Sequence, residues 1–252
     1  MRSYYGFREE ADGPVRRREG PGTDIVIVLS FGHEWEIDGE RRTSFVGGLY
    51  DRQVVTEHAG TSYGMQVNLP PPAAFALLRL PLHTLAQRTV GLDDVLGRGA
   101  DELVERLVAA PTWAARFELL DAAFARRLDD APRPSPGVEW AYERLRATHG
   151  RVRVRELADE LGWSRKRLAS GFREQVGVPP KTVARLLRFE RAAALAETGR
   201  LSWAEIAYAC GYYDQSHLVN EFRAITAQTP RAFVRDPTAG VTFFQDGDAV
   251  AS

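Results

Sequence analysis

Two short stretches of the chain carry side chains suited to contacting DNA bases. Residues 215–223, QSHLVNEFR, place a glutamine, a histidine, an asparagine and an arginine around a Leu-x-x-x-Phe pair. Residues 165–173, RKRLASGFR, repeat that apolar pair among arginine, lysine and serine. Asparagine and glutamine can pair with adenine through two hydrogen bonds, and arginine and lysine can bind guanine or the phosphate backbone. The chemistry indicated for both stretches is therefore recognition of a duplex.

Helical geometry separates the two faces of each stretch. Leu168 and Phe172 lie one turn apart, as do Leu218 and Phe222, so each pair is expected to face the core. The residues expected to face outward, or to lie at the margin, are Arg165, Lys166, Ala169, Ser170 and Arg173 in one helix and Gln215, Ser216, His217, Val219, Asn220 and Arg223 in the other.

Three of these residues have a second interpretation. Arg173 and Arg223 come late in their helices, where an arginine can bind phosphate or interact favourably with the helix dipole instead of contacting a base. His217 is equally well explained as a surface residue of the cap region.

The surroundings of the two stretches form an internal repeat. Residues 157–180 and 206–230 each contain a short helical pattern, a glycine, a polar capping residue and a second helical pattern that ends before proline. The capping residues are Ser164 and Asp214, and the second copy has one extra residue in its turn. This order predicts two helix-turn-helix units. The alternative, a solenoid of amphipathic helices, would need at least three units.

One long helix is expected between the two units. It starts at Pro180 and ends at Gly199, a length of about 30 Å. A helix of that length can space two recognition helices by roughly one turn of DNA, about 34 Å. Ser202 and Glu205 then form the pattern of a capping box at the start of the next helix.

With these motifs in place, the segment resembles the DNA-binding domain of the AraC/XylS family of bacterial transcription regulators. The residues that carry the resemblance are ELADELGWSRKRLASGFREQVGVPPKTVARLLRFERAAALA and WAEIAYACGYYDQSHLVNEFRAITAQTPRAF. Ala227 departs from the pattern, because the family usually has glycine before Ser/Thr-Pro, whereas Gly177 is retained in the first copy. The resemblance implies base-contacting positions at Lys166, Ala169, Ser170, Gln215, Ser216, His217 and Asn220.

Charge and composition divide the chain into segments. Residues 1–137 hold 16 basic and 20 acidic side chains, whereas residues 138–236 hold 17 and 12, and a basic excess favours a polyanionic partner. The stretch DDAPRPSPG cannot continue a helix. We therefore expect four segments: an effector-binding and dimerisation domain at 1–128, a linker at 129–137, the DNA-binding domain at 138–236 and a disordered tail at 237–252.

The first segment is expected to have an α+β fold, with short strands within residues 24–69 and helices from 72 to 128. The family resemblance implies that it is a small cupin-like β-sandwich or barrel with a helical dimerisation element. The charged run at 15–22 is expected to be a solvated loop, or else an arm that touches DNA or the other domain.

Aromatic and polar residues of this segment are candidates for an effector pocket. They are Trp35, Phe45, Tyr50, His58 and Tyr63, and the alternative is that they form an ordinary sandwich core. A metal-binding cupin would need a His-x-His pair, but His33 stands alone, so neither a metal nor another cofactor is expected.

The function expected from these features is regulation of transcription by a cytoplasmic protein that binds double-stranded promoter DNA. The single cysteine, Cys210, excludes an intramolecular disulfide, and no apolar run is long enough to span a membrane. Two versions remain open: a homodimer that responds to a small molecule, or a ligand-independent DNA binder whose first half only dimerises. RNA polymerase is a further candidate partner. An enzyme is not expected. The chain lacks the histidine pair that a metal cupin needs and the reactive cysteines that an alkyl-transfer repair protein needs.

Overall fold

The N-terminal part of the protein consists of two β-sheets that face each other. The computed structural model describes residues 3–236, 239–240 and 249–250. The strands are β1 (Ser3–Glu10), β2 (Val15–Glu19), β3 (Ile25–Ser30), β4 (Trp35–Ile37), β5 (Glu40–Arg42), β6 (Phe45–Gly47), β7 (Val54–His58), β8 (Thr61–Leu69), β9 (Thr89–Gly91), β10 (Ala239–Gly240) and β11 (Ala249–Val250). One sheet has the order β11-β1-β8-β3-β6-β9, and the other has the order β10-β2-β7-β4-β5. Within the described residues, strand pairings are antiparallel except that of β10 with β2, which is parallel.

The two faces of β3 show why its sequence is apolar throughout. Val28 packs between the sheets with Phe7, Trp35 and Phe45. The alternate residues of β3, such as Ile27, belong instead to the cluster that the helices cover. A strand buried on both faces has a continuous apolar sequence. The run DIVIVLSF has that pattern and so predicts burial on both faces.

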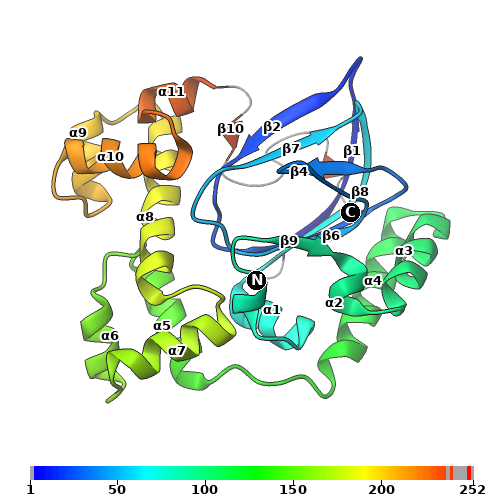
Figure 1. Ribbon diagram of the computed structural model, residues 1–252, viewed down its shortest axis with the longest axis horizontal. Coiled ribbons are helices and arrows are strands. Elements are labelled where there is room, and N and C mark those ends of the chain that lie inside the picture. The colour runs from blue at the N-terminus through cyan, green and yellow to red at the C-terminus, as the bar shows by residue number, and fades with distance from the viewer. Residues whose placement is uncertain (1–2, 237–238, 241–248, 251–252) are drawn as a thin grey trace.

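Helices cover the outer face of the six-stranded sheet and continue into the second half of the chain (Figure 1). Those of the first half are α1 (Pro71–Leu78), α2 (Leu92–Leu96), α3 (Gly99–Ala109) and α4 (Trp113–Leu128), with a short 3-10 helix, η1 (Leu82–Thr84). Gly6 on β1 is required by this packing, because a Cβ there would lie 2.2 Å from the ring of Trp113 on α4. The predicted α+β fold with a helical second half is confirmed.

The second half contains seven helices among the described residues. They are α5 (Pro136–Ala147), α6 (Val154–Glu160), α7 (Arg165–Gln175), α8 (Pro180–Glu197), α9 (Trp203–Ala209), α10 (Gln215–Thr226) and α11 (Pro230–Arg235). Helix α8 runs along the side of the β-sandwich, with α5, α6 and α7 near one end and α9, α10 and α11 near the other (Figure 1). At 1.5 Å per residue, its 18 residues span about 27 Å.

The hydrophobic core does not divide at the segment between α4 and α5. Leu168 and Phe172 of α7 belong to the same cluster as Ile27 of the sheet and Leu120 of α4. Leu218, Phe222 and their neighbours form a separate cluster with the C-terminal half of α8. The unit made of α6 and α7, here called the first unit, therefore shares its core with the N-terminal part. The unit made of α9 and α10, called the second unit, has its own core.

Several boundaries differ from the expectations. The linker expected at 129–137 ends at Ser135, because Pro136 is the first residue of α5. A proline is tolerated at that position because its missing N–H would have no partner there. The charged run at 15–22 is not a solvated loop in its first part, since Val15–Glu19 form β2 and pair with β7. Of the tail predicted to be disordered, 239–240 and 249–250 pair with β2 and β1, and the rest lies outside the described residues.

Ala227 occupies a backbone position that favours glycine. It ends α10 with φ of 57° and ψ of 9°, and Gly177 has φ of 97° at the matching place in the first unit. A left-handed conformation is strained for alanine. Replacing Ala227 by glycine is expected to raise the free energy of unfolding by about 1 kcal/mol, measured by chemical denaturation. The reverse change, Gly177→Ala, should lower it, and a loss of stability in Ala227→Gly would contradict the strain argument.

Candidate nucleic-acid interface

The turns of the two units have the same hydrogen-bond pattern. In the first, Trp163 N donates to the Ala158 carbonyl at 2.9 Å, and in the second, Tyr212 N donates to the Ala207 carbonyl at 2.9 Å. The preceding glycines, Gly162 and Gly211, have φ of 63° and 76°. Both turns thus use a left-handed glycine to reverse the chain.

Each second helix then begins at the predicted cap. The Ser164 hydroxyl accepts from Arg167 N at 3.1 Å, and the Asp214 carboxylate accepts from His217 N at 2.7 Å. Asp214 lies one residue farther from its glycine than Ser164 does, so the extra residue of the second copy is taken up in the turn. Downstream, the Ser202–Glu205 capping box is also present.

The structure separates the polar and apolar faces of α7 and α10 as the spacing predicts. Leu168, Phe172, Leu218 and Phe222 are fully buried. The exposed residues among those predicted to contact DNA are Arg165, Lys166, Ser170, Arg173, Gln215, Ser216, His217, Asn220 and Arg223, whereas Ala169 and Val219 are partly buried. Their contacts to bases or phosphates remain predictions.

The cations on these faces are available to an external anion. Among the residues that the structure describes, Arg165, Lys166, Arg173 and Arg223 have no carboxylate within 4 Å. Arg167 differs, because its guanidinium stacks on the Trp163 ring at 4.2 Å. Unpaired surface cations along two helices are suited to neutralising phosphates.

His217 is held by its own turn. Its Nδ1 accepts a hydrogen bond from Tyr213 N at 3.3 Å, and its ring packs edge-on against Tyr212 at 5.3 Å. Because Nδ1 is the acceptor, Nε2 carries the proton and points toward Glu221, 3.8 Å away. The structure therefore supports the cap-region interpretation of His217, with its exposed edge still able to reach a phosphate.

Two exposed aromatic residues near this turn are absent from the sequence-based set. Tyr208 on α9 is 88% exposed, and Tyr213 in the turn is 93% exposed. A tyrosine hydroxyl can donate to a phosphate oxygen.

Arginines of α8 hold the units in place. Arg188 donates to the Gly150 carbonyl at 3.0 Å and lies over the Tyr212 ring, so one side chain joins the segment before the first unit to the second unit. Arg185 pairs with Glu221 of α10 and lies 4.0 Å from Asp51 of the N-terminal part.

The C-terminal end of each recognition helix faces the N-terminal part. Gln53 N donates to the Ile225 carbonyl at the end of α10 at 3.0 Å. After α7, a Cβ on Gly177 would lie 3.1 Å from the Leu82 carbonyl oxygen of η1. The N-terminal turns of both helices carry the exposed polar residues, and it is these turns that contact base edges in helix-turn-helix proteins.

The candidate effector residues are mostly core residues. Trp35 and Phe45 are buried between the sheets, where their rings pack edge-on at 6.3 Å. Tyr63 lies on the other face of its sheet, against Trp113 of α4. Alternation along the strands sends these side chains to opposite faces, so the five residues do not line one pocket. Tyr50 alone among them borders the cavity next to α8.

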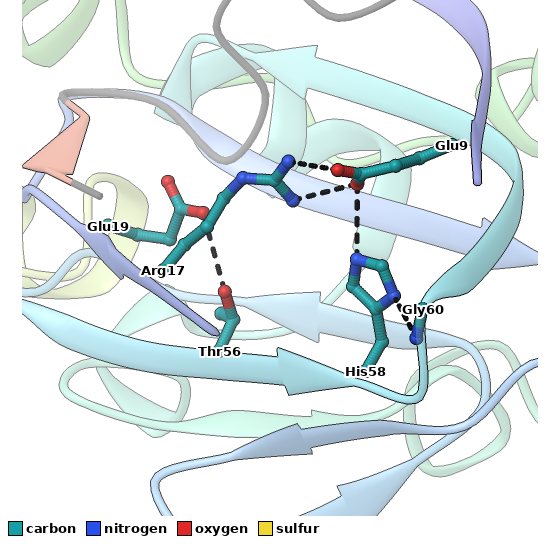
Figure 2. Close-up of polar contacts among 6 residues, drawn as sticks. All are labelled: Glu9, Arg17, Glu19, Thr56, His58 and Gly60. Atoms are coloured by element: carbon teal, nitrogen blue, oxygen red, sulfur yellow. Dashed lines mark hydrogen bonds and ion pairs between the residues drawn. The ribbon is translucent and has the colours of Figure 1, made fainter. Parts of the chain in front are cut away.

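His58 belongs to a polar network inside the sandwich (Figure 2). Its Nε2 lies 3.1 Å from a Glu9 oxygen, and Gly60 N donates to its Nδ1 at 3.3 Å. Arg17 donates to the same Glu9 carboxylate at 2.8 Å. Burial lowers the pKa of His58, so the ring is a neutral, hydrogen-bonded core histidine. No group of three or more metal-ligating side chains occurs in the described part of the chain.

Two buried carboxyl groups make stability depend on pH. Burial raises the pKa of Glu19 to about 8 and that of Glu190 to about 7. Arg17 and Glu9 face Glu19, while Asp24 and Arg146 face Glu190. The folded protein therefore keeps protons that the unfolded chain has released above about pH 4.5.

The sign of the pH effect follows from that difference. The stability that these protons provide is complete below about pH 4.5 and is lost as the pH rises to about 8. We expect the melting temperature to fall over this range, and to fall less in the double variant Glu19→Gln, Glu190→Gln. The exposed Glu36→Gln serves as control. Equal slopes in all three proteins would contradict the assignment.

Comparison with known proteins identifies the class of the second half. Residues 157–236 match the family model described as a helix-turn-helix domain. This part of the chain is a helix-turn-helix domain.

Particular relatives agree with that class. The chain is 40% identical over 72 residues to the F1 operon positive regulatory protein of Yersinia pestis, a match that covers 29% of this chain and 24% of that protein. It is 30% identical over 92 residues to the uncharacterized HTH-type transcriptional regulator YbfI of Bacillus subtilis, covering 36% and 33%. These matches thus span between a quarter and a third of the relatives' lengths.

The whole architecture also has a solved counterpart. An apo crystal structure of a ToxT variant from Vibrio cholerae superposes with a TM-score of 0.51 at 14% identity, covering 92% of this chain and 97% of that chain. The similarity extends the shared fold to the β-rich half. In the described residues, no helix is long and apolar enough to cross a membrane.

Proposed function

We propose that the protein regulates transcription by binding double-stranded promoter DNA through α7 and α10. The observation that carries the proposal is the pair of solvent-facing polar helix faces at the two ends of α8. Two relatives of the chain, named as a positive regulatory protein and a transcriptional regulator, agree with this role. In this arrangement, the two helices enter successive turns of the major groove.

The length of α8 supports that arrangement. Its 18 residues separate the units by about 27 Å, which approaches the roughly 34 Å repeat of B-DNA. The polar side chains of α10 and α7 suit different groups on the DNA. Gln215 and Asn220 are suited to adenine, and Lys166 and Arg165 are suited to guanine or phosphate.

Footprinting on the DNA upstream of the protein's own gene tests the proposal. Binding through two units predicts two protected segments one helical turn apart on the same face of the duplex. A protein that retards no promoter fragment at low salt would overturn it.

Arg223→Ala is expected to weaken binding to all DNA sequences alike. Arg223 is exposed late in α10 and has no acidic partner among the described residues, so it is placed to neutralise one phosphate. The slope of log K against log salt should fall by about 1. The measurement is a salt titration with a specific and a scrambled duplex. A loss confined to the specific duplex would instead make Arg223 a base contact.

The N-terminal part is proposed to sense a small molecule and to support a homodimer, and the alternative is that it only dimerises. The cavity beside α8 favours the first version, because it joins the sandwich to the helix that spaces the units. A ligand that binds one arrangement of the units more tightly would shift the DNA-competent population. Thermal-shift screening separates the versions, since a sensor is stabilised by its ligand.

A further inference from the structure

A small cavity lies where the β-sandwich meets α8. It has a volume of about 70 Å³ and is bordered by the end of β2, the loop that follows it, β3, β7, β8 and α8. Glu190 is its one lining residue from the helical half in the described part of the chain. Whatever occupies the cavity therefore touches both halves of the protein.

The charged groups that line the cavity all have the same sign. They are Glu19 from β2, Asp24 from the following loop and Glu190 from α8. Among the described residues, no lysine or arginine lines it. Two arginines outside the lining face these carboxyl groups. Arg17 of β2 faces Glu19 but is hydrogen-bonded to Glu9 (Figure 2), and Arg146 of α5 faces Asp24 and Glu190.

The carboxyl groups keep unused hydrogen-bonding capacity. Glu19 is 3% exposed, and it accepts a hydrogen bond from the Thr56 hydroxyl at the long distance of 3.4 Å. Glu190 accepts from Thr23 N at 2.7 Å and from the Thr23 hydroxyl at 3.1 Å. A carboxylate can accept about four hydrogen bonds, so both groups can accept from a ligand.

The rest of the lining is mixed, because Thr23, Tyr50 and Asn68 add polar atoms to an apolar wall. Val26 and Val54 line the cavity together with Pro21. A ligand that fits both features has a cationic end for the carboxylates and a short hydrocarbon part for the valines.

We propose that this cavity binds a small primary ammonium ion with a short apolar chain, held between Glu19 and Glu190. The proposal rests on the sensor role given above to the N-terminal part. It adds the chemical class of the effector: a cation, not an anion or a neutral metabolite. Since one carboxylate is on the sandwich and the other is on α8, the bound ion fixes the spacing helix against the sandwich.

The size of the cavity limits the ligand. One water molecule needs about 10–15 Å³ of cavity volume. The cavity of about 70 Å³ therefore holds on the order of five non-hydrogen atoms. The ammonium ion of n-butylamine has five. Larger amines would have to extend through the opening toward solvent.

Binding is coupled to release of a proton. The free Glu19 carboxyl is mostly protonated at neutral pH because burial raises its pKa to about 8. When the ammonium ion enters, the Glu19 carboxyl releases its proton to buffer, and the resulting carboxylate and the ammonium ion neutralise each other as an ion pair. The affinity for the amine should therefore rise between pH 6 and pH 8.

Three four-carbon probes test the charge requirement on the full-length protein without DNA. They are n-butylamine, 1-butanol and butyrate, each at the same millimolar concentration. We expect butylamine to raise the melting temperature by about 3–5 °C at ten times its dissociation constant, and we expect the other two not to raise it. Stabilisation by butanol or butyrate that equals that by butylamine would overturn the proposal, as would no stabilisation by butylamine.

Variants then locate the site. Glu19→Gln and Glu190→Gln keep the side-chain shape and should each remove most of the shift. Glu36→Gln, an exposed change on β4 of the same sheet as Glu19, should keep it. A shift that survives in both cavity variants would place the amine elsewhere and would refute this site.

Calorimetry in two buffers supplies a readout that does not depend on the variants. Proton release predicts a binding enthalpy that changes with the ionisation enthalpy of the buffer, and equal enthalpies would contradict the Glu19 mechanism. Because these measurements contain no DNA, a negative result would refute the amine site without affecting the proposal that the protein binds DNA. A negative footprinting result would refute DNA binding without affecting the amine site.

Discussion

Phe222→Ala is expected to lower the free energy of unfolding of the second unit by about 3–5 kcal/mol. The Phe222 ring lies at the centre of the second core, 4.8 Å from Phe189 of α8 and 5.8 Å from Phe233 of α11. Truncation removes both contacts and leaves a cavity, because α8 and α11 are anchored elsewhere. A loss of this size exceeds the stability that a small three-helix core can hold by itself.

The separate core makes this loss local. Phe222 belongs to the cluster of the second unit, whereas Phe172, its counterpart in the first unit, belongs to the cluster shared with the N-terminal part. Hydrogen exchange of Phe222→Ala should show lost protection in α9, α10 and α11 with α7 unchanged. The exposed change Ala224→Ser is the control. Unfolding of the whole chain in a single step would show that the two cores are coupled.

The double variant Gln215→Ala, Asn220→Ala is expected to lose base preference at one half of the binding site. Both side chains are exposed on α10, and their amides form no hydrogen bond with the residues that the structure describes. Each two-hydrogen-bond contact to adenine contributes about 1–3 kcal/mol, so affinity for the specific duplex should fall by about 5- to 150-fold for each residue lost.

Competition between the specific duplex and single-base substitutions measures this effect. The variant should treat substitutions in the half-site of α10 as equal while still discriminating those in the half-site of α7. Glu102→Gln, an exposed change on α3, should behave as the unchanged protein does. Unaltered preference in the double variant would show that α10 does not contact bases through these residues.

The helix-turn-helix units could be predicted in detail because their signals are local. A glycine at the turn, a capping residue and an apolar pair one turn apart determine the backbone path and the buried face within about twenty residues. Ser164, Asp214 and the pairs Leu168–Phe172 and Leu218–Phe222 all occupy the expected positions. The strands β3, β4 and β8 were predictable for the same reason, since each shows its burial pattern along its own sequence.

Other features depend on contacts between distant parts of the chain. The run VRRRE of β2 was taken for a loop because arginine dominates it, yet Arg17 and Glu19 face inward, where Glu9 and Thr56 accept or donate hydrogen bonds. The same limit applies to the candidate effector residues, since aromatic character does not reveal which face of a sheet a side chain occupies. Likewise, nothing near Glu190 in the sequence indicates that Thr23 lies beside it.

The core that α7 shares with the N-terminal part has a consequence for dissecting the molecule. A fragment cut in the segment before α5 would expose an apolar surface on α7, where Leu168 and Phe172 are now buried in the shared core and α7 packs against α1 and η1. Such a fragment should self-associate or require detergent, whereas grafting a foreign second unit after the middle of α8 should leave a soluble chimera. Modular exchange in this protein is therefore easier inside the spacer helix than at the proline-rich joint.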